Sequence, residues 1–196
     1  GKAHAIVANA GCANACTGEV GLANAHKMAA LAAEELGCKA DDVLVGSTGI
    51  IGVNLPMDKL AAGIKAAAAE LSEDGSRNAG NAIITTDTYS KACSTEVEIG
   101  GKAVRFGAIA KGSGMIQPNM ATMLCYITTD ANISSQLMQK ALSEIVEVTF
   151  NMISVDGDMS TNDTVLVLAN GESGMAEIQA DTPEYDKFCE VLGNMC

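Results

Sequence analysis

Thr122 lies in a stretch whose residue types could support self-cleavage of the chain followed by nucleophilic catalysis. A threonine hydroxyl is a weak nucleophile unless a base lies next to it, and an N-terminal threonine carries such a base as its own α-amine. With a pKa of about 8, that amine can accept the hydroxyl proton near neutral pH. Because an internal Thr122 lacks this amine, cleavage of the peptide bond after Ala121 would be the activating event.

The residues before Thr122 are suited to such a cleavage. Gly112 and Gly114 permit unusual backbone angles. Pro118 stiffens the approach, and the small side chain of Ala121 leaves the carbonyl of the bond unshielded. The Thr122 hydroxyl could then attack this carbonyl in an N-to-O acyl shift. From the residue types alone, an ordinary polar loop followed by a strand explains the same stretch.

Thr48 and Gly49 form a second candidate group. They follow a predicted buried strand at residues 43–45 and lie in a glycine-rich turn at residues 46–52. Such a turn can direct a hydroxyl and a backbone N–H at one point, where they would stabilise an oxyanion. One donor of this kind lowers a reaction barrier by about 3 kcal/mol. A plain strand-to-helix turn is the alternative interpretation.

Three aspartates, Asp156, Asp158 and Asp163, could supply oxygen ligands to a hard cation. Their spacing does not match an EF-hand loop. We therefore interpret them as turn formers and as helix or strand caps.

Cysteine and histidine side chains give no convincing metal site either. Cys12 and Cys16 are one helical turn apart, but no second Cys/His pair is nearby, which argues against zinc. His4 and His26 lack a convincing partner in the sequence, and structural roles are favoured over catalysis for both.

The composition excludes several classes of function. The formal net charge is −12 and the pI is near 4.4, without a cluster of Lys or Arg, so binding to nucleic acids or membrane surfaces is not expected. Hydrophobic residues make up 48% of the chain and aromatic residues 3%, so the core must be packed through many small side chains. Seven cysteines at irregular spacing favour a reducing, cytoplasmic setting over a disulfide framework.

Periodicity and turn residues predict loosely alternating strands and helices. Strands are predicted at residues 5–7, with a turn at 9–11, and at residues 43–45, 83–86, 95–99, 103–109, 122–128 and 165–168. Helices are predicted between Thr17 and Gly37, from Pro56 to about Leu71, from Ser134 or Ser135, and from Thr182. Gly100 and Gly101 are a two-residue hairpin signal. The predicted fold class is α/β (α+β), with helices packed in layers on β-sheets.

Residues 111–124 resemble the self-processing signature of the ornithine acetyltransferase (glutamate N-acetyltransferase) family. In that signature a Lys-Gly-(Ser/Ala)-Gly-Met loop leads to Pro-Asn-Met-Ala-Thr-Met-Leu, and both parts are intact here. Other segments are similar to the family in the same order, namely residues 13–18, 47–52, 55–57, 85–88, 154–158 and 161–163. The similarity covers nearly all 196 residues, with a departure at Cys12, where the family usually has asparagine.

The resemblance implies roles for individual residues. Thr122 would be the nucleophile, and the bond between Ala121 and Thr122 the processing site. Thr48 and Gly49 match the oxyanion-stabilising pair of the family.

Two further residues match substrate-contacting positions of the family. These are Lys111 and Thr85, with Thr86 as an adjacent alternative to Thr85. A lysine at this position could hold a substrate carboxylate as a fixed point charge. Taken alone, Lys111 would more often be a solvated surface cation.

The resemblance also implies an activity and a setting. An acetyl group would move from N-acetylornithine to Thr122, with release of ornithine, and then to glutamate, as a step of arginine biosynthesis. The fold would be a layered sandwich, with an N-terminal-nucleophile-type mechanism. The resemblance implies no metal and no cofactor, acetyl-CoA is left open as a co-substrate, and a cytoplasmic heterotetramer of two α and two β chains is expected.

We expect the chain to be the central part of such an enzyme. Residues 1–121 would then be the end of the α chain and residues 122–196 the start of the β chain, and the chain alone would not be fully active. Two rival functions remain at this stage. One is a self-processed amide hydrolase or aminopeptidase, in which water accepts the acyl group. The other is a non-catalytic partner or regulatory domain that retains the scaffold.

Overall fold

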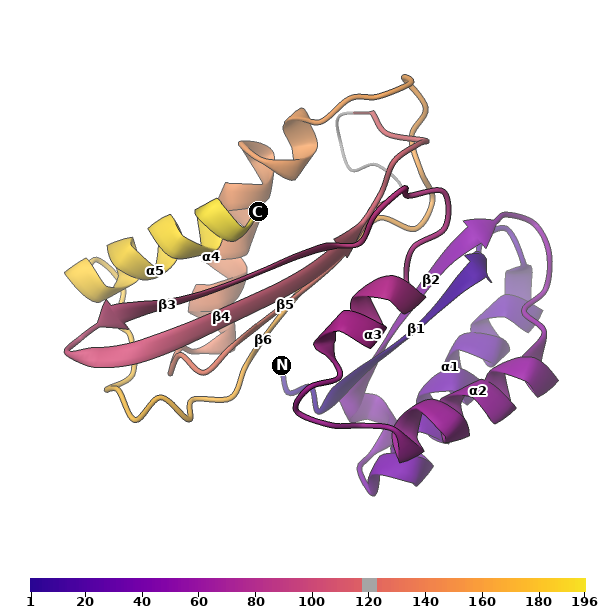
Figure 1. Ribbon diagram of the computed structural model, residues 1–196, viewed down its shortest axis with the longest axis horizontal. Helices are drawn as coiled ribbons and strands as arrows, with labels where there is room; N and C mark the ends of the chain where they lie inside the picture. The colour runs from indigo at the N-terminus through magenta and orange to yellow at the C-terminus, as the bar shows by residue number, and fades with distance from the viewer. Residues whose placement is uncertain (118–122) are drawn as a thin grey trace. The chain divides into compact units, whose positions relative to one another are not determined.

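A computed structural model describes residues 1–117 and 123–196 of the chain, which form two compact units, Gly1–Ser90 and Lys91–Cys196. Each unit consists of helices packed on a single β-sheet (Figure 1). The predicted fold class is therefore confirmed within each unit.

The first unit is built around a parallel pair of strands. Strands β1 (Ala5–Cys12) and β2 (Val43–Ile50) pair in register over their whole length, from Ala5 opposite Val43 to Cys12 opposite Ile50. Parallel neighbours need a long crossover, and α1 (Gly18–Leu36) with the short helix η1 (Ala40–Asp42) provides it. Helices α2 (Met57–Ala69) and α3 (Ser76–Ala82) follow.

Helix α1 begins and ends where the sequence predicts. Thr17 occupies the N-cap position, although its hydroxyl donates to Asn14 Oδ1 at 2.8 Å instead of capping the helix. Gly37 ends the helix with a φ of +67°, and its N–H bonds to the Ala33 carbonyl. Small side chains on α1 allow α2 and β2 to approach closely. The core of this unit consists of Met28, Ala29, Ala32, Ala33, Val43, Leu55 and Ile64.

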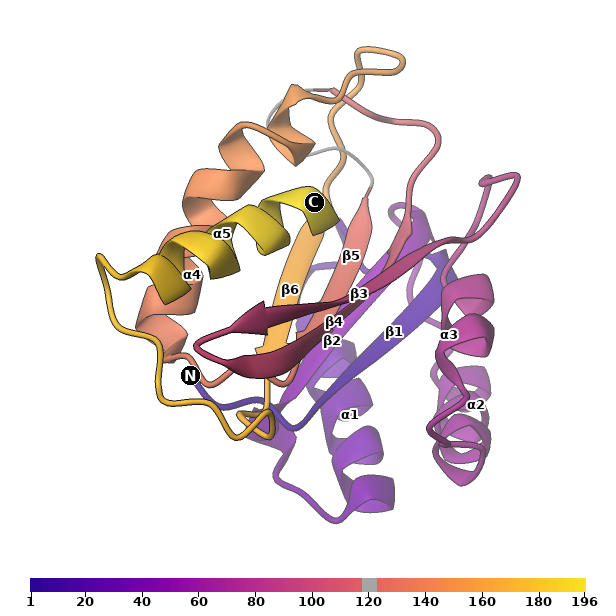
Figure 2. The same ribbon diagram turned by 60° about the vertical axis from the view of Figure 1, so that its left-hand side comes forward.

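The second unit has a four-stranded sheet in the order β3-β4-β5-β6. Its strands are β3 (Lys91–Ile99), β4 (Lys102–Lys111), β5 (Leu124–Thr129) and β6 (Thr164–Ala169). The first three are antiparallel, whereas β5 and β6 are parallel. The crossover between β5 and β6 contains α4 (Ser135–Glu147) and η2 (Phe150–Met152), and α5 (Pro183–Met195) follows β6 (Figure 2).

Local signals in the sequence fix several ends of these elements. Gly100 and Gly101, with φ of +58° and +72°, join the paired residues Ile99 and Lys102 in a two-residue turn that only such backbone angles allow. The Ser134 hydroxyl accepts the N–H of Leu137 at the start of α4. In the same way the Thr182 hydroxyl accepts the Tyr185 N–H at the start of α5, which has Pro183 in its first turn.

Helices α4 and α5 both contribute to the core of the second unit. Phe188 of α5 is fully buried, and its ring lies 5.6 Å from that of Phe106 on β4. Fully buried Ile127 on β5 and Ala141 on α4 belong to the same cluster. The side chains of both helices therefore cover one face of the sheet.

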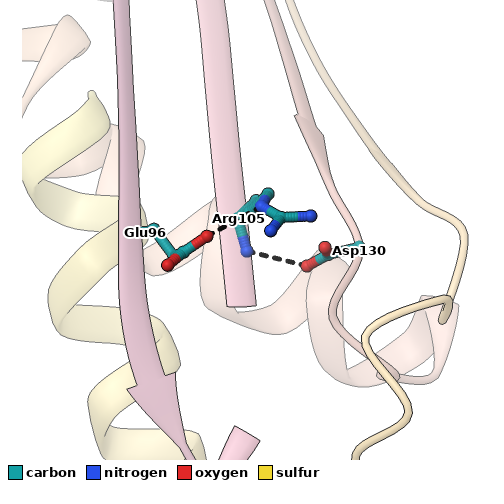
Figure 3. A network of polar contacts seen from close by, with 3 residues as sticks. All are labelled: Glu96, Arg105 and Asp130. Carbon is teal, nitrogen blue, oxygen red and sulfur yellow. Dashed lines mark hydrogen bonds and ion pairs between the residues drawn. The ribbon is translucent and has the colours of Figure 1, made fainter. Parts of the chain in front are cut away.

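Strands β3 and β4 also carry charged side chains that interact with each other. The Arg105 Nε lies 2.8 Å from Glu96 Oε2, its cross-strand partner, and the Arg105 N–H donates to Asp130 Oδ1 at 2.7 Å (Figure 3). The ion pair is exposed and adds little to stability. The bond to Asp130 continues the contact between β4 and β5 by one residue beyond Thr129.

Three predictions of secondary structure were wrong. β1 continues to Cys12 through the expected turn at residues 9–11, and β2 continues to Ile50, so that only residues 51 and 52 of the turn expected at residues 46–52 lie outside the strand. Both extensions form because the two strands pair with each other there, which outweighs their weak local β propensity. Residues 83–86 form no strand and instead follow α3, a helix that was not predicted.

Candidate functional site

Thr48 and Gly49 lie near the carboxyl end of β2, inside the strand and not in a turn after it. In the parallel pair they face Ala10 and Gly11 of β1, so the carboxyl ends of both strands meet at this edge. Ligand sites in parallel sheets form at such edges. The Thr48 side chain is 1% exposed.

Gly49 is a glycine for a steric reason that the sequence does not reveal. Its φ is +128°, a conformation that residues with a side chain rarely adopt. A Cβ at this position would lie 2.5 Å from the Gly11 carbonyl oxygen and 2.6 Å from the Cys12 nitrogen. Only glycine fits between the two strand ends.

The motif at residues 13–18 is held directly against this edge by Ser47. The Asn14 N–H donates to Ser47 Oγ at 2.8 Å, and Ser47 Oγ lies 2.9 Å from Asn9 Oδ1 and 3.0 Å from the Cys12 carbonyl. The Asn14 side chain in turn donates to the Gly21 carbonyl in α1 at 2.8 Å. Two segments that match the family signature are thus neighbours in the fold, joined by hydrogen bonds.

Thr85 lies in an irregular segment after α3 and is exposed. Its backbone N–H donates to Asp87 Oδ2 at 3.4 Å. The Asp87 side chain is buried, which restricts the backbone of this segment. Thr86 is exposed beside Thr85.

Lys111 is the last residue of β4 and is 2% exposed, so the alternative of a solvated surface cation is wrong. It pairs with Leu124, the first residue of β5, and Leu124 pairs with Thr164, the first residue of β6. The ends of three strands therefore meet here. A charged ammonium group this deeply buried needs a negative or strongly polar partner.

Asp163, directly before β6, lies at the same edge. Its Oδ1 accepts the Met123 N–H at 2.9 Å. Burial raises the pKa of the Asp163 carboxyl, while the bonds from Met123 and the Ser160 hydroxyl and the positive charge of Lys111 act in the opposite direction. The Lys111 charge and the Asp163 carboxyl are therefore close enough to interact.

Asp156 binds the chain before the proposed cleavage segment. Its carboxylate accepts the N–H of Met115 at 2.6 Å and that of Ile116 at 2.8 Å, and a third bond comes from the Asp158 N–H at 3.3 Å. The backbone bonds, led by that of Met115, lower the pKa of this exposed carboxyl. The last bond confirms the prediction of a turn former. The bonds to residues 115 and 116 were missed, because no local pattern connects positions 41 and 40 residues apart.

The predicted site residues thus lie in both units. Thr48, Gly49 and Thr85 belong to the first unit and Lys111 to the second, while Ala121 and Thr122 lie outside the described residues. Within residues 1–117 and 123–196, no group of three or more His, Cys, Asp or Glu side chains is arranged to hold a metal ion. Among the helices of these same ranges, none combines the length and apolarity needed to cross a membrane.

The chain is similar to known proteins of one family. The model of the ArgJ family matches residues 1–196. An arginine biosynthesis bifunctional protein ArgJ from Symbiobacterium thermophilum is 54% identical over 98% of this chain and 48% of its own length. One from Lactococcus lactis is 52% identical over 100% of this chain and 49% of its own length. The chain therefore spans about half the length of these curated relatives.

A solved structure is similar as well. The crystal structure of an arginine biosynthesis bifunctional protein argJ from Bacillus halodurans superimposes with a TM-score of 0.54 and 43% sequence identity. The match covers 59% of this chain and 61% of that chain.

Proposed function

Because the chain belongs to the ArgJ family, we propose that the complete protein containing it moves an acetyl group from N-acetylornithine to glutamate in arginine biosynthesis. The observation that carries this proposal is the family match over residues 1–196, within which the signature at residues 111–124 is intact. The transfer would proceed through an acetyl-Thr122 intermediate.

The first step prepares the nucleophile. The Thr122 hydroxyl adds to the Ala121 carbonyl, the C–N bond breaks, and the Ala121 acyl group moves to the hydroxyl oxygen as an ester. Water then hydrolyses the ester, which leaves a carboxylate on Ala121 and a free α-amine on Thr122. From then on the amine can accept the hydroxyl proton.

The second step is acetyl transfer in two halves. The Thr122 oxygen attacks the acetyl carbonyl of N-acetylornithine, and the amine of ornithine leaves with a proton delivered by the Thr122 amine. The amine of glutamate then attacks the acetyl ester, loses a proton and releases the Thr122 hydroxyl. N-Acetylglutamate is the product, and the enzyme returns to its starting state.

Four other residues support these steps. The Thr48 hydroxyl and the Gly49 N–H would stabilise the oxyanion of each tetrahedral intermediate. Lys111, assisted by Thr85, would hold the carboxylate of the substrate. The burial of Lys111 at an edge where three strand ends meet supports a fixed position for its charge, because little solvent surrounds the side chain there.

The remaining features of the proposal follow from the family. The reaction needs no metal or cofactor, since the acyl group is carried by Thr122, and acetyl-CoA would be an additional acetyl donor. The processed protein would be a cytoplasmic heterotetramer of two α and two β chains. Size-exclusion chromatography with light scattering tests the assembly.

Two variants of the complete protein test the proposed nucleophile. Intact-mass spectrometry of the wild-type protein should show two pieces that divide before Thr122. Thr122→Val, which removes the hydroxyl and keeps the shape, should remain uncut and transfer no acetyl group. Thr122→Ser keeps a hydroxyl and should still be cut. Full acetyl transfer by Thr122→Val, or by a wild-type protein that stays uncut, would refute the mechanism.

Incubation of the wild-type protein with N-acetylornithine, with and without glutamate, distinguishes a transferase from a hydrolase. With N-acetylornithine alone the transferase should stop at the acetyl-enzyme stage, visible as one added acetyl group on the piece that begins with Thr122. Addition of glutamate should then yield N-acetylglutamate. Release of acetate at a rate that does not depend on glutamate would instead identify an amide hydrolase.

A further inference from the structure

The loop between η2 and β6 contacts the chain on both sides of residues 118–122. Before this segment, the Val155 N–H donates to the Ile116 carbonyl at 2.7 Å. After it, the Thr164 N–H donates to the Met123 carbonyl at 2.9 Å. The loop and the first residue of β6 therefore contact both described flanks of the segment that holds the proposed cleavage bond.

Asp156 secures the flank before the segment. Its two carboxylate oxygens accept the adjacent N–H groups of Met115 and Ile116. Met115 has a φ of +59°, which is uncommon for a residue with a side chain, and charge-assisted bonds of this kind can hold such a conformation in place. The path of the chain into the segment is thus fixed by a carboxylate.

Asp163 secures the flank after the segment. Met123 is buried, and both of its backbone polar groups are bonded to the chain directly before and at the start of β6. The bond from its N–H to Asp163 Oδ1 is 2.9 Å long. Met123 directly follows Thr122 in the sequence, so the residue next to the proposed nucleophile is held through both its N–H and its carbonyl group.

We propose that Asp163 is a positioning residue for the nucleophile, acting as the hydrogen-bond acceptor that fixes the backbone of Met123. This inference rests on the proposed function, since it assigns a partner to the proposed nucleophile. Asp163 acts through Met123 and takes no part in bond formation. Its contribution is geometric, and a displacement of about 1 Å at a reacting group is enough to slow a reaction by about a hundredfold.

Two conservative variants distinguish the role of Asp163 as a hydrogen-bond acceptor from the role of its negative charge. Asp163→Asn keeps an oxygen on the same atom position and removes the negative charge. Its new N–H₂ group can donate to the Ser160 hydroxyl, which is able to reverse its own bond. Asp163→Glu keeps the charge and moves the oxygens by one methylene group. Asp158→Asn is the matched control, because its contact with Asp156 is made by its backbone N–H.

The readout is the rate of cleavage before Thr122 in the complete protein, followed by intact-mass spectrometry after synthesis. Positioning through the acceptor predicts that Asp163→Asn and Asp158→Asn are cut at nearly the wild-type rate. Asp163→Glu should be cut at least about tenfold more slowly than Asp163→Asn. Circular dichroism establishes that each variant is folded.

The outcomes separate this inference from the proposed function. A wild-type protein that is never cut overturns both. A wild-type protein that is cut, together with an Asp163→Glu variant cut as fast as Asp163→Asn or faster, overturns the positioning role alone. The latter result would assign Asp163 to charge compensation of Lys111 instead.

Discussion

Replacement of Gly49 by alanine tests whether this position is constrained by packing. The alanine Cβ would lie 2.5 Å from the Gly11 carbonyl oxygen and 2.6 Å from the Cys12 nitrogen, and both atoms are backbone that cannot rotate away. The φ of +128° adds conformational strain of about 1–3 kcal/mol. With the displacement of β1 included, we expect a loss of about 3 kcal/mol in the free energy of unfolding.

The matched control is Gly63→Ala in the middle of α2. A Cβ at Gly63 would have no heavy atom within 4 Å, and alanine is a better helix former than glycine by about 1 kcal/mol. The same substitution is therefore expected to have opposite signs at the two positions. This comparison removes any general effect of an added methyl group.

Urea unfolding followed by far-UV circular dichroism measures both effects. With a denaturant dependence of about 2 kcal/mol per molar urea, Gly49→Ala should lower the midpoint by about 1.5 M and Gly63→Ala should raise it by about 0.5 M. An unchanged midpoint for Gly49→Ala would refute the steric argument. If acetyl transfer were lost in that case, the glycine would be required for oxyanion stabilisation and not for packing.

Two other residues give predictions of the same kind. Ser47→Ala removes the acceptor of the Asn14 N–H and should lower the free energy of unfolding by about 1–3 kcal/mol. The exposed control Ser143→Ala should change it by less than about 0.5 kcal/mol. Equal effects of the two substitutions would contradict a stabilising role for the hydrogen bonds of Ser47. The pKa of Asp156 is lowered in the folded protein, so its stabilising effect should be present above the ordinary carboxyl pKa and be lost as the pH falls through the lowered value. The difference in unfolding free energy between wild type and Asp156→Asn, measured by urea unfolding at several pH values, should therefore shrink in acid, and a difference that grows there would contradict this assignment.

Helices α1, α4 and α5 and the hairpin were predictable because their ends are determined by local chemistry, whereas α3 was not predicted. Gly37 ends α1 with a left-handed backbone, and Gly100 and Gly101 form the tight turn of the hairpin. Ser134 and Thr182 supply the hydroxyls that begin α4 and α5. Each of these signals acts within a few residues, so no knowledge of the tertiary structure is needed.

The ends of β1 and β2 could not be predicted in this way. Glycine in a strand is normally a sign of a turn or a bulge, and Gly46 and Gly49 were interpreted accordingly. In the structure, Gly11 and Gly49 face each other across the parallel pair, and a Cβ at Gly49 would collide with the backbone of Gly11 and Cys12. The β structure of residues 46–50 is thus a property of the pair, and neither segment reveals it alone. Residues 83–86 show the reverse case, where β-branched side chains follow a helix without forming a strand.

The roles of Asp156 and Asp163 also depend on contacts between distant segments of the chain, so neither could be predicted from local sequence. β5 and β6 pair in parallel with Leu124 opposite Thr164, and the bond between Met123 and Asp163 keeps this offset of 40 residues one position before the strands. The bond between Ile116 and Asp156 has the same offset of 40, although both residues lie well outside the sheet. The loop before β6 therefore contacts the described chain before β5 at two points, Ile116 and Met123. A parallel pair built to hold a sheet together needs no such continuation, since its own ladder supplies the hydrogen bonds. Carboxylates at these two points restrain both described flanks of residues 118–122, which is what a positioned backbone cleavage would need.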